Sequence, residues 1–238
     1  MPLEIAIEES RLAEHLALGV LLLEGVRNRG EAVEIRDPLD ALNLSELRAL
    51  FGSEQGRQEL LGPARRLYRA LGIDPTKHRP SSEALIRRVV AGDFPRVAPL
   101  VDAVNLASVV TRLPFGLYDL DCLEPPIVAR LGKEGEGYSG IRKAFVNIAG
   151  RIALFDRLGA FGNPTSDSDR AKATGSTERA LVVIYGPAGM AREAWDGILD
   201  LAERTIRARL GCSCSERRLV GGPGGSAGSS FGSRAEEK

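Results

Sequence analysis

The sequence is poor in several residue types on which whole classes of protein depend. Its 238 residues include three cysteines, two histidines and 5% aromatic residues. Three cysteines are too few for a disulfide framework, so a reducing, cytoplasmic setting is expected. The low aromatic content argues against an extensive surface that stacks nucleic-acid bases. Neither sign of charge dominates, because 32 basic residues balance 32 acidic ones, and the whole surface is not built to hold a polyanion.

Long apolar runs are also missing. The best candidate, from Leu16 to Leu23, contains Gly19 and ends at Glu24, so it is much shorter than a membrane-spanning helix and no membrane partner is predicted. Neither His15 nor His78 lies near a nucleophile in a recognisable setting. Because no Gly-x-Ser-x-Gly motif occurs either, the sequence disfavours a Ser-His-Asp hydrolase.

Signals for metal or cofactor binding are weak. Cys212 and Cys214 have no second pair of cysteine or histidine ligands beside them, so no metal site is predicted. Asp167 and Asp169 lack the spacing of a calcium loop, and turn formation is the favoured interpretation of these acids. The glycines between residues 132 and 140 lead to no Gly-Lys-Ser/Thr sequence, and no bound cofactor is expected.

The patterns that are present predict helices first, strands in the middle and one closing helix, an order typical of an α+β fold. Apolar spacing predicts helices over residues 45–51, 59–71, 83–91, 99–111 and 190–210. Apolar runs predict strands over residues 3–7, 16–23, 117–120, 127–131, 144–148, 152–155 and 181–185. Gly150 and Arg151 are typical of a tight hairpin turn between two of these strands. We expect one domain over residues 1–215 and a flexible Gly/Ser-rich tail over residues 216–238.

Three features carry candidate function. The first is a long polar loop from Phe161 to Thr174, a type of segment that is usually functional or disordered. The second is Asn105, a polar residue on the apolar helix 99–111, which needs either a backbone partner or a ligand if it is buried. The third is a cluster of basic residues that would either hold a phosphate backbone or form a solvated surface paired with Glu59 and Glu83. The residues predicted to face RNA are Arg65, Arg66, Arg69, Lys77, Arg79, Arg87 and Arg88.

Two motifs resemble a known family. Leu100-Val-Asp-Ala-Val-Asn105, followed at the family's spacing by Leu113-Pro-Phe-Gly-Leu-Tyr-Asp119, is similar to the B3/B4 module of the phenylalanyl-tRNA synthetase beta subunit. The segments from Tyr68 to Leu85 and from Gly162 to Arg170 resemble the solo version of this module. The resemblance covers residues 65–187. It implies a three-layer β/β/α sandwich with mixed sheets and flanking helices.

The resemblance also implies a function. In the synthetase, the module accepts a wrongly attached amino acid, chiefly tyrosine, and hydrolyses its ester to tRNA. Asn105 matches the family's pocket asparagine, but Val104 replaces a threonine and Gly116 replaces the histidine near the ester. Val183 stands where the family has an acid that reads the tyrosine hydroxyl, so the resemblance implies weak selectivity for tyrosine.

We therefore expect a module that binds tRNA or aminoacyl-tRNA and edits mischarged tRNA in trans as an aminoacyl-tRNA deacylase. Two alternatives stay open: a non-catalytic protein that binds a free amino acid or a similar small ligand, and an RNA-binding accessory with an inactive pocket. Hydroxyl groups on the polar loop would help to position water during hydrolysis. The residues expected to line the pocket are Asn105, Gly116, Asn163, Thr165, Ser166 and Ser168.

Overall fold

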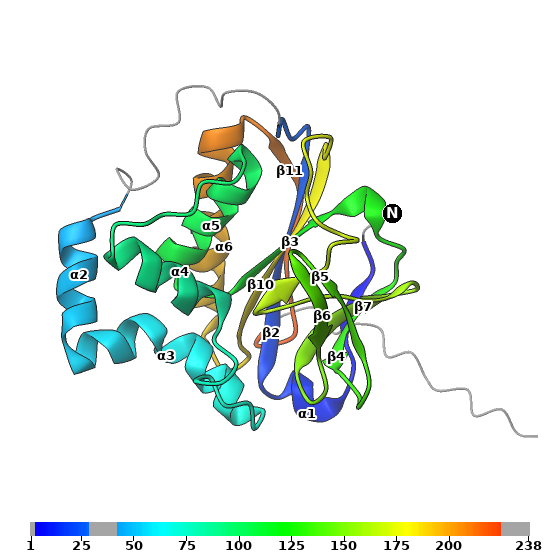
Figure 1. Cartoon of the computed structure of the whole chain (residues 1–238), viewed down its shortest axis with the longest axis horizontal. Coiled ribbons are helices and arrows are strands. Elements are labelled where there is room, and N and C mark those ends of the chain that lie inside the picture. Colours follow the sequence, from blue (N-terminus) through cyan, green and yellow to red (C-terminus); the bar gives the residue numbers. More distant parts are fainter. Residues whose placement is uncertain (1–2, 29–41, 225–238) are drawn as a thin grey trace, which may run out of the picture.

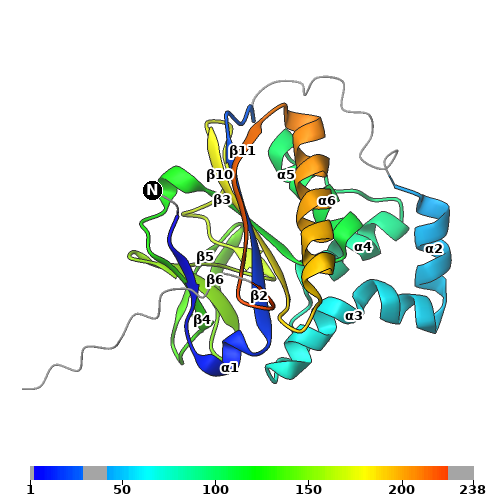
Figure 2. The ribbon, with the colours of Figure 1, turned by 180° about the vertical axis from the view of Figure 1, so that it is seen from behind.

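The structure of the chain, a computed structural model, describes residues 3–28 and 42–224. Two β-sheets lie face to face, and helices cover the other face of one of them (Figure 1). From behind, helix α6 (Arg192–Leu210) lies along the four-stranded sheet, with the five-stranded sheet on the far side (Figure 2). The layers follow the order sheet, sheet, helix, and the predicted α+β fold of β/β/α type is confirmed.

The outer sheet has five strands in the order β1-β4-β7-β8-β9. It is mixed, because β1 is parallel to β4 while the other neighbours are antiparallel. The last two strands form a tight hairpin that overlaps the start of the segment that the sequence predicts to be a loop. The strands are β1 (Ile5–Ile7), β4 (Ile127–Leu131), β7 (Ile152–Asp156), β8 (Gly159–Asn163) and β9 (Ser166–Asp167).

The central sheet has four strands in the order β11-β2-β10-β3, and each of its pairings is antiparallel. Its two longest strands are apolar along nearly their whole length because both faces of this sheet are covered. The strand β11 corrects a prediction, since it extends five residues into the segment expected to be a flexible tail. Residues 225–238 of that tail lie outside the described residues. The strands are β2 (Leu16–Glu24), β3 (Phe115–Asp119), β10 (Arg179–Pro187) and β11 (Ser213–Val220).

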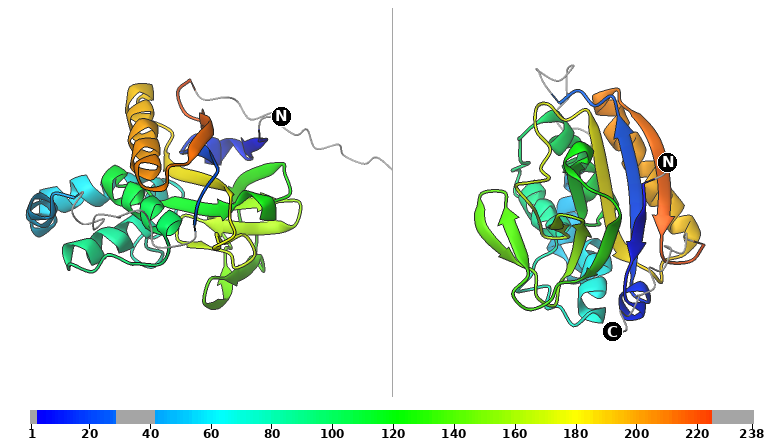
Figure 3. Two further views of the ribbon diagram at one scale, coloured as in Figure 1. Left: turned by 90° about the horizontal axis from the view of Figure 1, so that it is seen from above. Right: turned by 90° about the vertical axis from the view of Figure 1, so that its right-hand side faces the viewer.

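A two-stranded ribbon of β5 (Gly137–Gly140) and β6 (Lys143–Asn147) projects from the side of the sheets (Figure 3). The hairpin predicted at Gly150 and Arg151 is therefore wrong. A turn does form there, with the Arg151 N–H donating to the Ile148 carbonyl, but β6 pairs with β5 while β7 pairs with β4 and β8. Most side chains of β6 are exposed, so the strand would bury little apolar surface by joining the outer sheet.

The helices gather on one side of the sheets, apart from a single turn, α1 (Ser10–Ala13), that leads into β2 (Figure 3). The helix predicted to begin at residue 59 begins five residues earlier, where the Ser53 side chain accepts a hydrogen bond from the Gly56 N–H as an N-cap. The remaining elements are α2 (Leu44–Gly52), α3 (Glu54–Ala70), α4 (Ser81–Val90), α5 (Pro99–Thr111) and the 3₁₀ turn η2 (Leu120–Cys122).

The alternation of side chains along the central strands separates two cores. In β10, Leu181 and Val183 pack between the two sheets, whereas Val182 and Ile184 pack against α5 and α6. The strand β3 alternates in the same way, because Tyr118 faces the space between the sheets while Phe115 and Leu117 face the helices. These central strands therefore contribute side chains to both cores.

Tyr118 lies at the centre of the space between the sheets and is fully buried. Its hydroxyl lies 3.1 Å from the Tyr185 hydroxyl, and its ring makes an edge contact with the Phe161 ring, 4.8 Å between centroids. The ring fits because Gly116 and Gly162 have no side chains. A Cβ atom at either glycine would lie 2.2 Å from the tyrosine oxygen, far closer than packing allows.

The substitution Gly162→Ala is expected to destabilise the protein by about 1–3 kcal/mol, because the added methyl group would force Tyr118 out of its packed position. Gly197→Ala on α6 is the matched control. A Cβ there meets no atom within 4 Å, so the same change should stabilise the helix by about 0.5–1 kcal/mol. Urea unfolding followed by circular dichroism measures both. Equal midpoints for the two variants would contradict this account of the core.

Candidate functional site

A cavity of about 410 Å³ opens between α4, α5, β3 and the segments around residues 141 and 167. Most of its wall is apolar, with Val101 and Val104 from α5, Phe115 and Leu117 from β3, and Ile141 beside the β5–β6 ribbon. The polar residues that also line it are Ser81, Asn105, Ser108, Arg142, Asp167 and Lys172.

Local structure explains why these side chains meet. Val101, Val104, Asn105 and Ser108 are spaced at i, i+3, i+4 and i+7 along α5, so they share one face of the helix. The Ser108 hydroxyl donates 2.7 Å to the Leu113 carbonyl and is thereby occupied within the protein. Asn105 lies beside it, half-buried at the cavity wall. The asparagine of the family motif is thus directed at a cavity.

Asp167 contributes the carboxylate of the cavity. Burial raises the pKa of Asp167 to about 7, and the Tyr118 hydroxyl and the Leu117 N–H only partly oppose that effect. The Leu117 N–H lies 3.5 Å from Oδ2. Oδ1 is buried and has no hydrogen-bond partner among the described residues. A buried oxygen in this state calls for a donor from a ligand or a water molecule.

Two cationic side chains lie at the same cavity. Lys172 is held by Asp169, with 2.6 Å between Nζ and Oδ1. Arg142 is exposed and has a positive φ of 58° in the turn between β5 and β6. The cavity therefore combines an apolar wall, an amide, a carboxyl group of raised pKa and two positive charges, which together suit a small ligand with both apolar and polar parts.

The structure brings Asn105 to the cavity but not Gly116. Gly116 lies on the opposite face of β3, beside the Tyr118 hydroxyl, whereas Phe115 and Leu117 on either side of it line the cavity. Gly116 therefore does not line this cavity, although it was expected to, and instead leaves room for the Tyr118 side chain. Val183 pairs with Gly116 across the sheet and is buried between the two sheets.

The four polar residues expected from the 161–174 loop hydrogen-bond to other groups of the protein. Asn163 Oδ1 accepts hydrogen bonds from the N–H groups of Thr165 and Ser166, at 2.8 and 2.9 Å, a turn typical of asparagine. The Thr165 hydroxyl lies 3.0 Å from the Tyr68 hydroxyl. Ser166 accepts from Lys143, and Ser168 accepts from the Ala171 N–H. None of these four lines the 410 Å³ cavity; Asp167, between two of them, does.

The predicted basic cluster divides in the structure. Glu83 is 2% exposed and pairs with Arg65, Arg79 and Arg87, at 2.7, 3.7 and 3.0 Å. Burial acts to raise the pKa of Glu83, but hydrogen bonds from Arg65 and Arg87 outweigh it and hold the pKa below its usual value. Arg88 pairs with Asp93 instead. A separate surface groove is lined by Arg65, Arg66, Arg69 and Arg87, without Lys77, Arg79 or Arg88.

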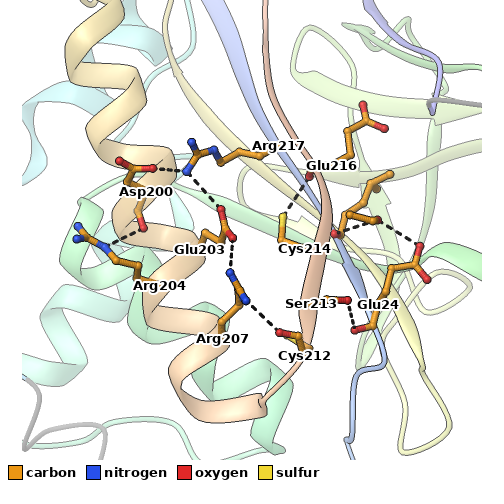
Figure 4. A network of polar contacts seen from close by, with 12 residues as sticks. Glu24, Asp200, Glu203, Arg204, Arg207, Cys212, Ser213, Cys214, Glu216 and Arg217 are labelled. Carbon is orange, nitrogen blue, oxygen red and sulfur yellow. Dashed lines mark hydrogen bonds and ion pairs between the residues drawn. The ribbon is translucent and has the colours of Figure 1, made fainter.

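The two cysteines near the end of the described chain belong to the junction between α6 and β11 (Figure 4). Arg207 donates to the Cys212 carbonyl at 3.2 Å, and Cys214 Sγ donates to the Glu216 carbonyl. Burial raises the pKa of both thiols, which favours their protonated form. Within residues 3–28 and 42–224, no three His, Cys, Asp or Glu side chains cluster as metal ligands. No helix of these ranges has the length and apolarity to cross a membrane.

Comparison with known proteins defines the class. A family model described as the B3/4 domain matches residues 63–191, which is more than half of the chain. The chain therefore belongs to the B3/4 domain family, and the resemblance seen in its motifs is confirmed. The matched segment holds α4, α5, β3 and the β8–β9 hairpin, so it includes the cavity.

Among solved structures, the chain is similar to an N-terminal fragment of the phenylalanyl-tRNA synthetase beta subunit from Pyrococcus horikoshii. The two share 13% sequence identity with a TM-score of 0.44, over 90% of this chain and 50% of that fragment. The chain thus spans about half the length of that fragment. No protein with curated annotation matches it.

Replacement of Asp167 by asparagine is expected to stabilise the unliganded protein at pH 8. Because the folded-state pKa is raised above the unfolded value, ionisation of Asp167 costs stability as the pH rises from about 4 through about 7. Each pKa unit corresponds to about 1.4 kcal/mol, and screening by solvent reduces the total to about 1–3 kcal/mol at pH 8. Urea unfolding should show little gain at pH 4. Asp169→Asn, which changes an exposed acid two residues away, should give no gain at either pH.

Proposed function

We propose that this chain is a free-standing B3/4 module that binds the aminoacyl end of a tRNA and hydrolyses its ester in trans. One observation carries the proposal: Asn105 and Asp167 converge on an apolar cavity of about 410 Å³. This volume lies within the range of roughly 300–1,000 Å³ typical of small-molecule sites. The solo-type segment from Tyr68 to Leu85 supports a module that acts apart from a synthetase.

The apolar wall suits the side chain of an amino acid. Val104, Phe115 and Leu117 offer a surface without hydrogen-bonding groups, so burial of an aliphatic or aromatic side chain there gains free energy in proportion to its area. Asn105 offers one acceptor and two donor hydrogens. It would orient the α-amino or carbonyl group of the ligand, in keeping with its match to the family's pocket asparagine.

Asp167 is suited to act as the general base. A base works best when its pKa lies near the working pH, and the pKa of Asp167 is about 7. A water molecule bonded to Oδ1 would pass a proton to that oxygen while its own oxygen attacks the ester carbonyl carbon. The bond between the acyl carbon and the ribose oxygen then breaks, and Asp167 returns the proton to that leaving ribose oxygen, which becomes the hydroxyl group of the tRNA.

The positive charges of the cavity would stabilise the negative charge that develops on the carbonyl oxygen. Arg142 and Lys172 are the donors available for this role, and donors that face a developing oxyanion lower the barrier. The histidine that the family places near the ester is replaced by Gly116 on the far face of β3. Asp167 would take over its function from another strand.

A second function is favoured by the same two cations. Arg142 and Lys172 complement a free carboxylate, which an aminoacyl ester lacks, while the ionised Asp167 complements an α-ammonium group. A protein that binds a free amino acid without catalysis would use the cavity in this way. Hydrolysis and binding assays on one protein preparation separate the two functions.

Hydrolysis of a panel of mischarged tRNAs tests the leading proposal. Wild-type protein should deacylate at least one member of the panel, at a rate that rises with pH through about 7 and then levels, because the base must be unprotonated. Asp167→Asn should lower kcat by about 10²–10⁴-fold, the usual contribution of a general base. Asn105→Ala should chiefly raise KM, because it removes a positioning contact.

The control for this experiment is Asp196→Asn, which removes an exposed carboxylate on α6 that pairs with Arg192 outside the cavity and should retain activity. Full activity of Asp167→Asn would overturn the role of Asp167. No deacylation across the panel, together with calorimetric binding of a free amino acid that Asn105→Ala weakens, would replace the leading function with the non-catalytic one. If the protein binds tRNA but neither deacylates the panel nor binds a free amino acid, the function that fits is an RNA-binding accessory with an inactive pocket.

A further inference from the structure

A second concave surface lies on the opposite side of α4 from the cavity and is lined mainly by arginine. It is a groove of about 660 Å³ along α3, completed by one side chain from α4. We call it the arginine groove. Its cationic residues are Arg57, Arg65, Arg66, Arg69 and Arg87, and its one acidic residue is Glu54.

The groove concentrates charge on a chain whose net charge is zero. Five arginines against Glu54 and the buried Glu83 leave an excess of three positive charges at this place. Within the described part of the chain, Arg66 and Arg69 form no ion pair. A local excess without internal compensation attracts anions although the protein as a whole does not.

Glu83 fixes part of the groove in position. Arg65 makes two hydrogen bonds to its carboxylate, at 2.7 and 2.8 Å, and Arg87 makes a third at 3.0 Å. The carboxylate is buried, so both guanidinium groups are held at the protein surface with little freedom to turn. Ligand binding then costs less side-chain entropy than it would with mobile arginines.

The remaining arginines are placed by the helices. Arg57 donates to the carbonyl groups of Phe51 and Gly52 at the end of α2, which ties it to the rim of the groove. Arg66 lies across Gly62, where a Cβ atom would meet its Nη1 at 2.8 Å. Glycine at this helical position costs stability, and here it leaves room for a guanidinium group to lie against the helix.

The length of the groove indicates the type of anion. Twelve residues separate Arg57 from Arg69 along α3, which corresponds to about 18 Å at the helical rise per residue. One phosphate group spans only a fraction of this length. A chain of regularly spaced phosphates matches it, and arginine forks bind phosphate oxygens in pairs.

We propose that the arginine groove binds the phosphate backbone of an RNA strand. This inference rests on the proposed function, because it names the surface that would hold the tRNA whose aminoacyl end enters the cavity. Helix α4 joins the two surfaces, since Ser81 and Leu85 line the cavity while Arg87 lines the groove. The contacts are to phosphates, so the groove supplies affinity without reading base sequence.

Fluorescence anisotropy with uncharged, labelled tRNA at several salt concentrations tests the groove. The double variant Arg66→Glu/Arg69→Glu should bind at least about tenfold more weakly than wild type, because it reverses two charges that face the backbone. The slope of log K against log salt concentration should fall by about two, one for each lost phosphate contact. Both residues are exposed, so the variant should keep the wild-type unfolding midpoint.

Arg204→Glu is the matched control, because it reverses an exposed arginine on α6 whose bond is to the Asp200 carbonyl within the helix. It should bind tRNA as wild type does. Unchanged affinity and salt slope in Arg66→Glu/Arg69→Glu would overturn the groove. A mononucleotide that displaces tRNA at equal phosphate concentration would overturn an extended phosphate chain as its occupant.

The two proposals fail in different ways. An aminoacyl-adenosine ester lacks the phosphate backbone, so Arg66→Glu/Arg69→Glu should hydrolyse it as fast as wild type, whereas Asp167→Asn should not. Conversely, Asp167→Asn should bind uncharged tRNA with wild-type affinity. If the protein binds tRNA through the groove but hydrolyses no ester, the groove proposal stands and the catalytic proposal fails.

Discussion

The burial of the central sheet on both faces is the constraint on which the rest of this structure depends. β2 and β10 pack against the outer sheet through one set of side chains and against α5 and α6 through the other. A strand in that position must be apolar at nearly every residue, and no polar function fits in its middle. The polar residues of the cavity and the groove therefore come from other elements, chiefly the short hairpin β8–β9 and the helices, beside the edge strand β3.

This arrangement explains the composition of the cavity. The face of β3 that meets the helices supplies Phe115 and Leu117, while Tyr118 closes the space between the sheets beneath them. Asp167 reaches the cavity from the neighbouring hairpin, and its burial there raises its pKa although the Tyr118 hydroxyl partly opposes that effect. The packing that stabilises the sandwich therefore also places a carboxyl group that would take up a proton near neutral pH beside the cavity.

Sequence reasoning succeeded where a residue's environment is set by strong periodicity. The apolar stripe of residues 99–111 predicted α5, and the apolar runs predicted β2 and β10, because a wrong register there would expose many apolar side chains. It failed on β5, β8 and β9, which are short, lack a run of branched apolar residues and depend on particular turns such as that of Asn163. Asp167 was treated as a turn-forming acid for the same reason. In a run of alternating Ser and Asp residues, the sequence does not indicate which side chains face the interior of the protein.

The arginine cluster shows why ion pairing and ligand binding are not exclusive interpretations. The expected partner Glu83 does pair with three arginines, yet one carboxylate neutralises only one positive charge. A buried ion pair adds little net stability once the loss of hydration is counted, so the geometry is not explained by stability alone. Its effect is to hold Arg65 and Arg87 in place beside the unpaired Arg66 and Arg69. A buried acid at this point makes the arginine surface more rigid while leaving it positive, which is what recognition of a phosphate chain requires.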